Sequence, residues 1–304
     1  MLRVAPLAAG GGNLVVVAGA RHESIILAQL AAIGVQARII LEPEARDSAP
    51  AMAAAAAWIA GDDAAGIAAF VSSDHHVPDA AAFRLAVLEA ARAARDGRLV
   101  TLGVTPTAPS TAYGYIRPSG AGLCPVEAFV EKPGPAAAAA YVASGYLWNT
   151  GNFIVQASTL LEEVRAFAPQ VEAAASASLK AGIRGEVIHL DAIFAEAPKI
   201  SIDYAVMEHT SRASVLPVEF AWSDVGAWDA VAATGLGAKG TPVLLNADHC
   251  LVRAPAGVLV AVVGLSHIAV VVEADSVLVC NLEDAQSVKA VVDRARRLTP
   301  EPFE

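Results

Sequence analysis

Short apolar runs alternate with longer helical patterns over the first third of the chain. Runs rich in β-branched residues predict strands, and between them apolar residues recur at the spacing of one helix face. The predicted strands cover residues 14–18, 37–41, 68–72 and 99–104, and the predicted helices cover 23–33, 50–60 and 79–94. Strands separated by helices of this length indicate βαβ units. We therefore expect an α/β fold with a doubly wound, mostly parallel sheet.

The pattern changes after residue 241. Short apolar runs at 242–245, 257–263, 268–272 and 276–280 are separated by turn residues, with no clear internal repeat. Such spacing is typical of a small β-rich domain. We therefore expect two domains, 1–238 and 239–304, with a basic-faced helix at 288–298 closing the second. Earlier in the chain, Thr159 and Glu162 have the spacing of a capping box, which predicts the start of a helix there.

Composition and charge argue against two classes of partner. Of the 304 residues, 55% are hydrophobic, many of them alanine, and 17% are charged. The longest apolar run, 49–60, is shorter than the roughly 20 residues that cross a bilayer, so we expect no membrane partner. The formal net charge is −10 and no run of Lys or Arg occurs, which argues against a nucleic-acid partner.

The cysteines bear on the cellular compartment. Cys124, Cys250 and Cys280 are scattered and form no CxxC motif, which argues against a disulfide framework or a zinc site. Scattered thiols fit a reducing compartment, so we expect the protein to be cytoplasmic. The apolar β-rich end of the chain is in addition a candidate interface for a homodimer.

Residues 126–153 carry the most informative chemistry. Residues 129–133 read Phe-Val-Glu-Lys-Pro, and residues 146–153 read Tyr-Leu-Trp-Asn-Thr-Gly-Asn-Phe. The carboxylate of Glu131 can accept hydrogen bonds from sugar hydroxyls, and the ammonium of Lys132 can neutralise a phosphate. Asn149 can both donate and accept. The combination predicts a sugar-phosphate site, although a Glu-Lys pair before a proline is by itself more often a surface turn.

Acidic residues at strand ends are candidates for a metal site. Asp74 directly follows a predicted strand, where ligands of open α/β sheets bind, and Asp224 lies in the Trp-Ser-Asp-Val-Gly segment. Mg²⁺ is commonly bound by one or two carboxylates together with phosphate oxygens, so these two residues could share one ion. The alternatives are a helix-capping Asp74 and a turn residue at Asp224. Asp203 is explained equally well by a site role or by an N-cap.

Two further segments are candidates for ligand contacts. Residues 42–50 form a polar loop that leads into a helix N-terminus, an arrangement suited to a nucleobase edge or an anion. The alternative is an ordinary loop with a pair between Arg46 and Asp47. Gly114 lies between two tyrosines and allows close approach of a ligand to the backbone, although a β-bulge would also explain this glycine.

Taken together, these segments resemble those of the mannose-1-phosphate guanylyltransferases, also called GDP-mannose pyrophosphorylases, which are sugar-phosphate nucleotidyltransferases. The similarity follows the order and spacing of that family over nearly the whole chain. The segments that carry it are residues 42–50, 73–75, 105–116, 129–133, 146–151, 200–208 and 222–228.

The resemblance implies a fold of the nucleotide-diphospho-sugar transferase type, which is Rossmann-like. It also implies that GTP and mannose 1-phosphate react in the presence of Mg²⁺ to give GDP-mannose and pyrophosphate. In this family Asp74 and Asp224 would hold the metal ion, and Lys132 would bind the sugar phosphate. The other residues carried over are Glu131, Asn149, Gly114, Gly151 and Asp203 at the sugar, and Glu42, Arg46, Asp47 and Ser48 at the guanine.

Some positions differ from the family pattern. No Gly-rich loop with a basic residue precedes the first predicted strand, and Ala112 and Ser110 replace a usual Gly and Glu. The family's Arg-Asn-Thr is Arg-Asp-Ser at residues 46–48. The chain as given is therefore expected to turn over slowly or not at all. Three alternatives stay open, namely a start farther upstream, a non-catalytic relative that binds sugar nucleotide, and an inactive or structural relative.

Overall fold

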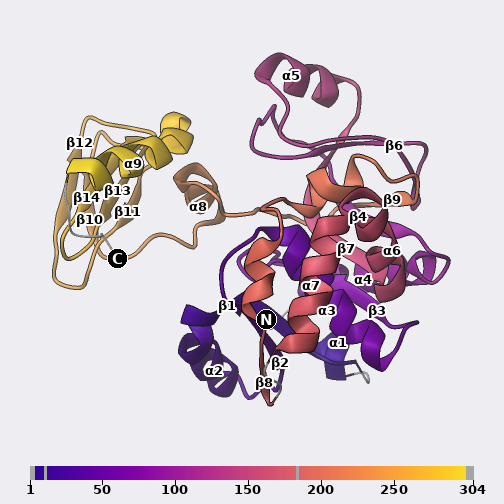
Figure 1. Ribbon diagram of the computed structural model, residues 1–304. Helices are drawn as coiled ribbons and strands as arrows, with labels where there is room; N and C mark the ends of the chain where they lie inside the picture. Colours follow the sequence, from indigo (N-terminus) through magenta and orange to yellow (C-terminus); the bar gives the residue numbers. More distant parts are fainter. Residues whose placement is uncertain (1–3, 10–11, 183–184, 299–304) are drawn as a thin grey trace. The chain divides into compact units, whose positions relative to one another are not determined.

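The computed structural model describes residues 4–9, 12–182 and 185–298 and divides the chain into two compact units. The first unit contains the chain up to Ser73 together with Val77–Ala221, and the second contains Asp74–His76 and the chain from Trp222 onward (Figure 1). The boundary expected between residues 238 and 239 therefore lies inside the second unit. The reason is that helix α8 (Trp228–Thr234) packs against elements of the C-terminal region.

The first unit begins with a small parallel sheet. Its strand order is β1 (Val15–Gly19), β2 (Arg38–Glu42) and β8 (Val187–His189), and both pairs are parallel. Helix α2 (Glu23–Ala32), which follows the 3-10 turn η1 (Ala20–His22), places Ile26 and Leu30 against the sheet residues Ile39 and Leu41. Of the apolar residues that give this helix its periodic pattern, Ile26 and Leu30 are buried, whereas Leu27 is exposed.

A larger sheet of six strands forms the centre of the first unit. Its strand order is β3-β7-β4-β9-β6-β5, and β4–β9 is the parallel pair, whereas the other pairings are antiparallel. The α/β class is therefore confirmed, but this sheet is mixed, because the long strand β7 runs antiparallel between β3 and β4. The strands are β3 (Ile67–Phe70), β4 (Leu99–Val104), β5 (Tyr115–Pro118), β6 (Cys124–Val130), β7 (Leu147–Gln156) and β9 (Ala213–Val218).

Helices pack against this sheet. Helix α3 (Ser48–Asp62) lies beside α6 (Ala157–Phe167) and α7 (Pro169–Ala181), while α4 (Ala80–Ala94) contacts β3, β4, β7 and β9 (Figure 1). The fully buried face of α3 is made largely of alanine, which lets neighbouring helices approach closely. The shorter elements are α1 (Ala5–Ala9), α5 (Pro135–Ala143), the 3-10 turn η2 (Ala192–Glu196) and the π-helical turn η3 (Asp203–Met207).

Of two helix starts predicted from the sequence, one agrees with the structure and the other does not. The Asp79 carboxylate accepts hydrogen bonds from the backbone N–H groups of Ala81 and Ala82, so it caps α4. The capping box at Thr159 is wrong, because α6 begins at Ala157 and the Thr159 side chain is buried. Tertiary packing of that first turn outweighs the local capping pattern.

The second unit is built from stacked β coils. Strands β10 (Pro242–Leu245) and β12 (Val260–Val263) pair in parallel, as do β11 (Leu251–Arg253) and β13 (Ile268–Val272), with β14 (Val277–Asn281) antiparallel to β13. Residue 242 pairs with 260 and residue 251 with 269. Both pairs are separated by 18 positions, so one coil is 18 residues long. The repeat is not visible in the sequence, because residues that stack on each other in successive coils differ in type, as Pro242 and Val260 do.

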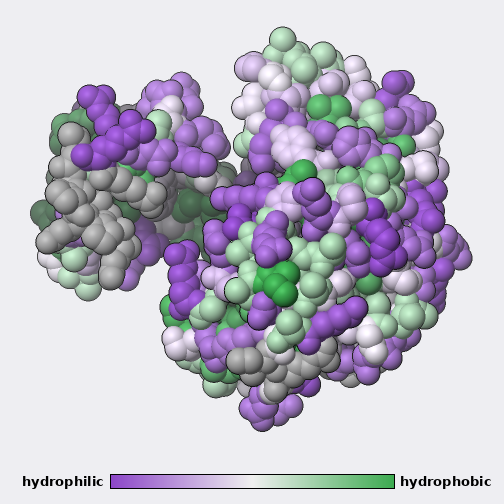
Figure 2. Space-filling model, in the orientation of Figure 1, coloured by the Kyte–Doolittle hydropathy of each residue, from purple (hydrophilic) through white to green (hydrophobic). Residues whose placement is uncertain are grey.

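The described part of the second unit ends in the turn η4 (Leu282–Ser287) and helix α9 (Val288–Leu298), whose visible face is hydrophilic (Figure 2). On the visible surface of the first unit, hydrophilic residues are interspersed with moderately hydrophobic ones (Figure 2), and its alanines occupy both buried and exposed positions. Among the helices of the described ranges, none combines the length and the apolar character needed to cross a membrane.

Gly103 in β4 gives a test of the packing in the larger sheet. A methyl group at this position would lie 2.8 Å from Val215 Cγ2 and 2.9 Å from Leu147 Cδ1. We predict that Gly103→Ala lowers the free energy of unfolding by about 1–3 kcal/mol, the usual cost of overpacking, when measured by urea denaturation. Gly120→Ala is the matched control, since a methyl group there has open space. Equal stability of the two variants would contradict this packing.

Candidate active site

A bulge in β7 positions the first side chain of the site. Thr101 of β4 pairs with Phe153, and Gly103 pairs with Asn149, so one residue of β4 faces three of β7. Gly151 lies in the bulge with φ of 65°, a left-handed conformation that glycine adopts without strain. Its backbone N–H donates to Asn149 Oδ1 at 3.2 Å. Gly151 therefore acts on the site through Asn149.

Asn149 is buried and connects two strands with a distant turn. Its Oδ1 also accepts from Thr101 Oγ1 at 2.8 Å, and its Nδ2 donates to Asp203 Oδ1 at 2.8 Å. The amide is thereby oriented so that one of its donors holds the Asp203 carboxyl group. Sequence reasoning missed Thr101, although a polar residue inside the apolar strand Leu99–Val104 was the available signal.

Asp203 begins the π-helical turn η3, for which Ile202 is the N-cap residue. The N-cap alternative is therefore wrong, since the Asp203 carboxyl group accepts from Asn149. Burial, followed by the negative charge of Glu131, raises the pKa of Asp203 to about 7. Close to neutral pH this group can thus either accept or donate a proton in a hydrogen bond to a ligand hydroxyl.

Glu131 and Lys132 follow the end of β6. The Lys132 Nζ lies 3.1 Å from Glu131 Oε1, and the side chain of Glu131 is 9% exposed whereas that of Lys132 is 57% exposed. Glu131 Oε2 occupies the space that a Cβ at residue 114 would fill, so a side chain at Gly114 would displace the carboxylate from this position. The Gly114 carbonyl accepts from the Asn149 backbone N–H at 2.8 Å.

The charge state of Lys132 follows from these neighbours. Partial burial works to lower the pKa of Lys132, but the ion pair with Glu131 and the nearby Tyr204 and Asp203 outweigh it and raise the pKa above its ordinary value. Lys132 is therefore a fully charged ammonium at neutral pH. A half-exposed ammonium beside a buried carboxylate can bind a phosphate while the carboxylate binds a hydroxyl.

The loop at residues 42–48 is tied to the same region. Asp47, with φ of 70°, accepts from the Ser48 N–H at 2.7 Å and caps α3. Ser48 Oγ accepts from the Ile202 N–H at 2.9 Å, directly before Asp203. Arg46 pairs with Glu44 at 3.1 Å, so the expected pair between Arg46 and Asp47 is not formed among the described contacts. The loop and the turn η3 therefore hold each other in place.

Glu42 ends β2 and is buried, with an exposed fraction of 8%. Burial raises the pKa of this carboxyl group to about 7. Within the described part of the chain, its Oε1 and the Nε of Arg46 have no hydrogen-bond partner. Buried polar atoms of this kind are rare in folded proteins, and they are explained by local strain, by a functional role, or by a water, ion or ligand that supplies the partner.

Asp74 and Asp224 belong to the second unit. His76 and Ser223 form an isolated antiparallel bridge, with N···O distances of 2.8 and 3.1 Å, so Asp74 lies two residues before one bridge residue and Asp224 directly after the other. The bridge thus brings together segments far apart in the sequence. Asp224 also accepts from the Gly226 N–H at 3.1 Å, as the turn alternative predicts.

Among the described residues, no group of three or more His, Cys, Asp or Glu side chains could hold a metal ion by itself. A pair of carboxylates fits a Mg²⁺ ion that takes its remaining ligands from phosphate and water. The neighbouring His75 accepts from Trp222 Nε1 at 3.2 Å through its Nδ1, which makes this imidazole a structural partner of the tryptophan.

Two family models match the chain. The model of the nucleotidyl transferases matches residues 5–236, and the model described as the MannoseP isomerase/GMP-like beta-helix domain matches residues 240–295. The stacked coils of the second unit agree with the latter description. The chain is 41% identical to the xanthan biosynthesis protein XanB of Xanthomonas campestris pv. campestris strain B100, over 97% of this chain and 65% of that protein.

A mannose-1-phosphate guanylyltransferase of Sinorhizobium fredii is 37% identical, over 93% of this chain and 58% of its own length. The chain thus spans less than two thirds of these curated relatives. A crystal structure described as mannose-1-phosphate geranyltransferase from Thermus thermophilus is 34% identical, with a TM-score of 0.84, and the match covers 97% of this chain and 87% of that one.

The raised pKa of Asp203 predicts a pH effect on stability. The folded state keeps the proton up to a pKa of about 7, whereas the ordinary value of this group is 3.8, so its contribution to stability falls as the pH rises between the two. Asp203→Asn removes this titration and keeps the acceptor for Asn149. We predict that wild-type stability declines more steeply over this window than that of the variant, by at most about 1.4 kcal/mol per pH unit.

Urea denaturation at several pH values between the two pKa values measures this difference. Asp96→Asn, which changes an exposed carboxylate, is the control and should follow the wild-type slope. Parallel curves for wild type and Asp203→Asn would show that Asp203 has no raised pKa.

Proposed function

Because the chain belongs to the nucleotidyl transferase family, we propose that it transfers GMP from GTP to mannose 1-phosphate, giving GDP-mannose and pyrophosphate. The names of its relatives support this substrate pair. The single observation that carries the proposal is the cluster of Glu131, Lys132, Asn149 and Asp203, which offers an ammonium for a phosphate beside carboxyl groups for vicinal hydroxyls.

The reaction needs no covalent enzyme intermediate. An oxygen of the sugar phosphate attacks the α-phosphorus of GTP, a new P–O bond forms, and the bond from that phosphorus to the bridging oxygen of the β-phosphate breaks. Pyrophosphate leaves with the electron pair of this bond. Catalysis is then mainly positioning and charge neutralisation. Lys132 supplies positive charge to the attacking phosphate, and Glu131 and Asp203 orient the sugar through its hydroxyls.

The nucleoside half of the proposal rests on the loop at residues 42–48. The unpartnered Oε1 of Glu42 would accept a hydrogen bond from a donor on the base, and Arg46 Nε would donate to an acceptor. Guanine presents both kinds of group on its edges. Asp47 and Ser48 hold the loop against α3 and the turn η3, so they support this binding through the backbone.

We also propose that Asp74 and Asp224 hold Mg²⁺. The ion would neutralise phosphate charge and help pyrophosphate to leave. The bridge between His76 and Ser223 supports this assignment, because it brings together the segments that carry Asp74 and Asp224, and Mg²⁺ at nucleotide sites keeps most of its ligands for phosphate and water.

Asp224→Asn tests this metal site. The sequence leads us to expect slow pyrophosphate release from GTP and mannose 1-phosphate, and whatever release the wild-type chain gives should fall by about a hundredfold or more in this variant, since losing one metal carboxylate removes several kcal/mol of charge stabilisation. The variant still offers an oxygen that can accept from the Gly226 N–H, so the turn is expected to survive. Asp248→Asn, an exposed position in the same unit, is the matched control.

Unchanged release in Asp224→Asn would contradict the metal assignment. Wild-type protein that binds GDP-mannose tightly but releases no pyrophosphate would refute the proposed activity and support the alternative of a non-catalytic sugar-nucleotide-binding relative.

A homodimer through the second unit is a further part of the proposal. Exposed apolar side chains gather on its coils, among them Leu259 at 71%, Val263 at 62% and Val277 at 65% exposure. Apolar surface of this extent commonly marks an interface. We predict a dimer mass by light scattering at micromolar concentration, shifting toward the monomer in Val263→Lys. A monomer at all concentrations would exclude the dimer.

A further inference from the structure

Lys132 has a backbone conformation that requires support from its surroundings. Its φ of 46° lies in the left-handed region, which is unfavourable for residues other than glycine. The residue follows directly on Glu131, where the chain leaves β6 and the sheet no longer supplies hydrogen bonds. An interaction from outside the strand must therefore hold this turn.

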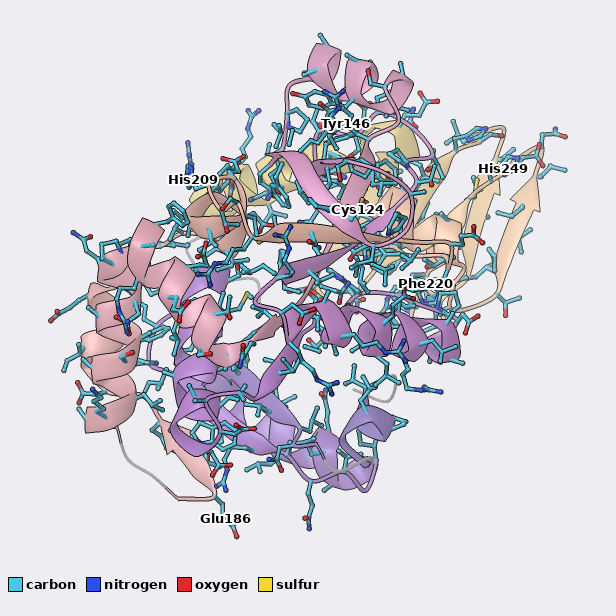
Figure 3. All side chains as sticks on the ribbon, turned by 90° about the vertical axis from the view of Figure 1, so that its right-hand side faces the viewer. Cys124, Tyr146, Glu186, His209, Phe220 and His249 are labelled. Atoms are coloured by element: carbon cyan, nitrogen blue, oxygen red, sulfur yellow. The ribbon has the colours of Figure 1, made fainter. Side chains whose placement is uncertain are left out.

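Glu208 supplies that interaction. Its Oε1 accepts a hydrogen bond of 2.9 Å from the backbone N–H of Glu131, although the two residues are 77 positions apart. A carboxylate acceptor makes this bond stronger than one between neutral groups. Glu208 therefore pins the residue before Lys132 to the end of the turn η3. His209, labelled in Figure 3, is the next residue in the chain.

The π-helical geometry of η3 explains why Glu208 can act in this way. The Glu208 N–H donates to the Asp203 carbonyl at 3.0 Å, which is an i to i+5 bond. Residues five apart therefore lie one turn above each other, whereas an α-helix would align residues three and four apart. At one end of the turn, the Asp203 carboxyl group accepts a hydrogen bond from the Asn149 side chain. At the other end, the Glu208 carboxylate accepts one from the backbone N–H of Glu131. Both ends of the turn thus serve the same site.

We propose that Glu208 is a positioning residue of the sugar-phosphate site, holding the left-handed turn at Glu131 and Lys132 so that the Lys132 ammonium is fixed for phosphate binding. This inference rests on the proposed function for the identity of the ligand. Glu208 acts through the backbone, because the described ion pair of Lys132 is with Glu131 and not with Glu208. Its contribution should therefore depend on Lys132 being present.

Two substitutions at Glu208 test the proposal. Glu208→Ala removes the acceptor, and Glu208→Gln keeps a carbonyl oxygen at the same place. Calorimetry of mannose 1-phosphate binding should show a dissociation constant raised about tenfold in Glu208→Ala, close to the loss of one charge-assisted hydrogen bond, and a smaller change in Glu208→Gln. Binding of GTP should stay as in wild type, which a general loss of stability would not produce.

A double-mutant cycle shows whether Glu208 works through Lys132. Lys132→Ala should weaken binding, and Glu208→Ala should add little on that background, because the two changes disrupt one arrangement. Glu89→Ala, at an exposed position of α4, is the matched control and should bind as wild type does. Equal effects of Glu208→Ala with and without Lys132, or no effect at all, would overturn the proposal.

A readout without ligand separates this proposal from the proposed function. The pH dependence of acylation at Lys132, followed by mass spectrometry, reports the ion pair with Glu131. Glu208→Ala should shift this profile to lower pH, because a loosened turn weakens that pair. An unshifted profile would overturn the positioning role. A shifted profile in a protein that binds no mannose 1-phosphate would uphold the role of Glu208 and refute the proposed substrate.

Discussion

The hydrogen bond from Asn149 to Asp203 is the contact on which the candidate site depends. It joins a bulged strand of the central sheet to the π-helical turn η3, two elements with no sequence proximity. The bulge exists because Gly151 adopts a left-handed conformation, and the turn exists because its hydrogen bonds run from residue i to i+5. If either element were regular, the amide and the carboxyl group would point elsewhere.

The electrostatics of the first unit follow from this arrangement. One ammonium, that of Lys132, lies near the carboxyl groups of Glu131 and Asp203, so negative groups outnumber the positive one. Burial, followed by the negative charge of Glu131, raises the pKa of Asp203 to about 7, so this carboxyl group keeps its proton up to near neutral pH. Such carboxyl groups can accept hydrogen bonds from hydroxyl donors of a ligand, and the ammonium can bind an anionic group.

The two units of the chain differ in how their cores are packed. The first unit buries an alanine-rich helix against two sheets, and close approach of the backbones supplies its packing. The second unit stacks short coils of 18 residues, as the strand registers show, and its small core consists of residues such as Val252, Val262 and Val270. Apolar side chains such as Leu259 and Val277 remain exposed along these coils.

By itself, the sequence determined the α/β class and the β-rich end, and it supplied the candidate residues of the site. Periodicity reports local structure well, as the strand at 99–104 and the helix at 288–298 illustrate. The motif around Glu131 and Asn149 predicted a sugar-phosphate site, because residue types alone limit what can bind a phosphate and a hydroxyl. Tertiary structure decided the strand directions of the central sheet, the stacking of the coils, the pairing of Arg46 with Glu44 and the role of Glu208. These features depend on contacts between residues that are distant in the chain, and a local sequence pattern contains no information about such contacts.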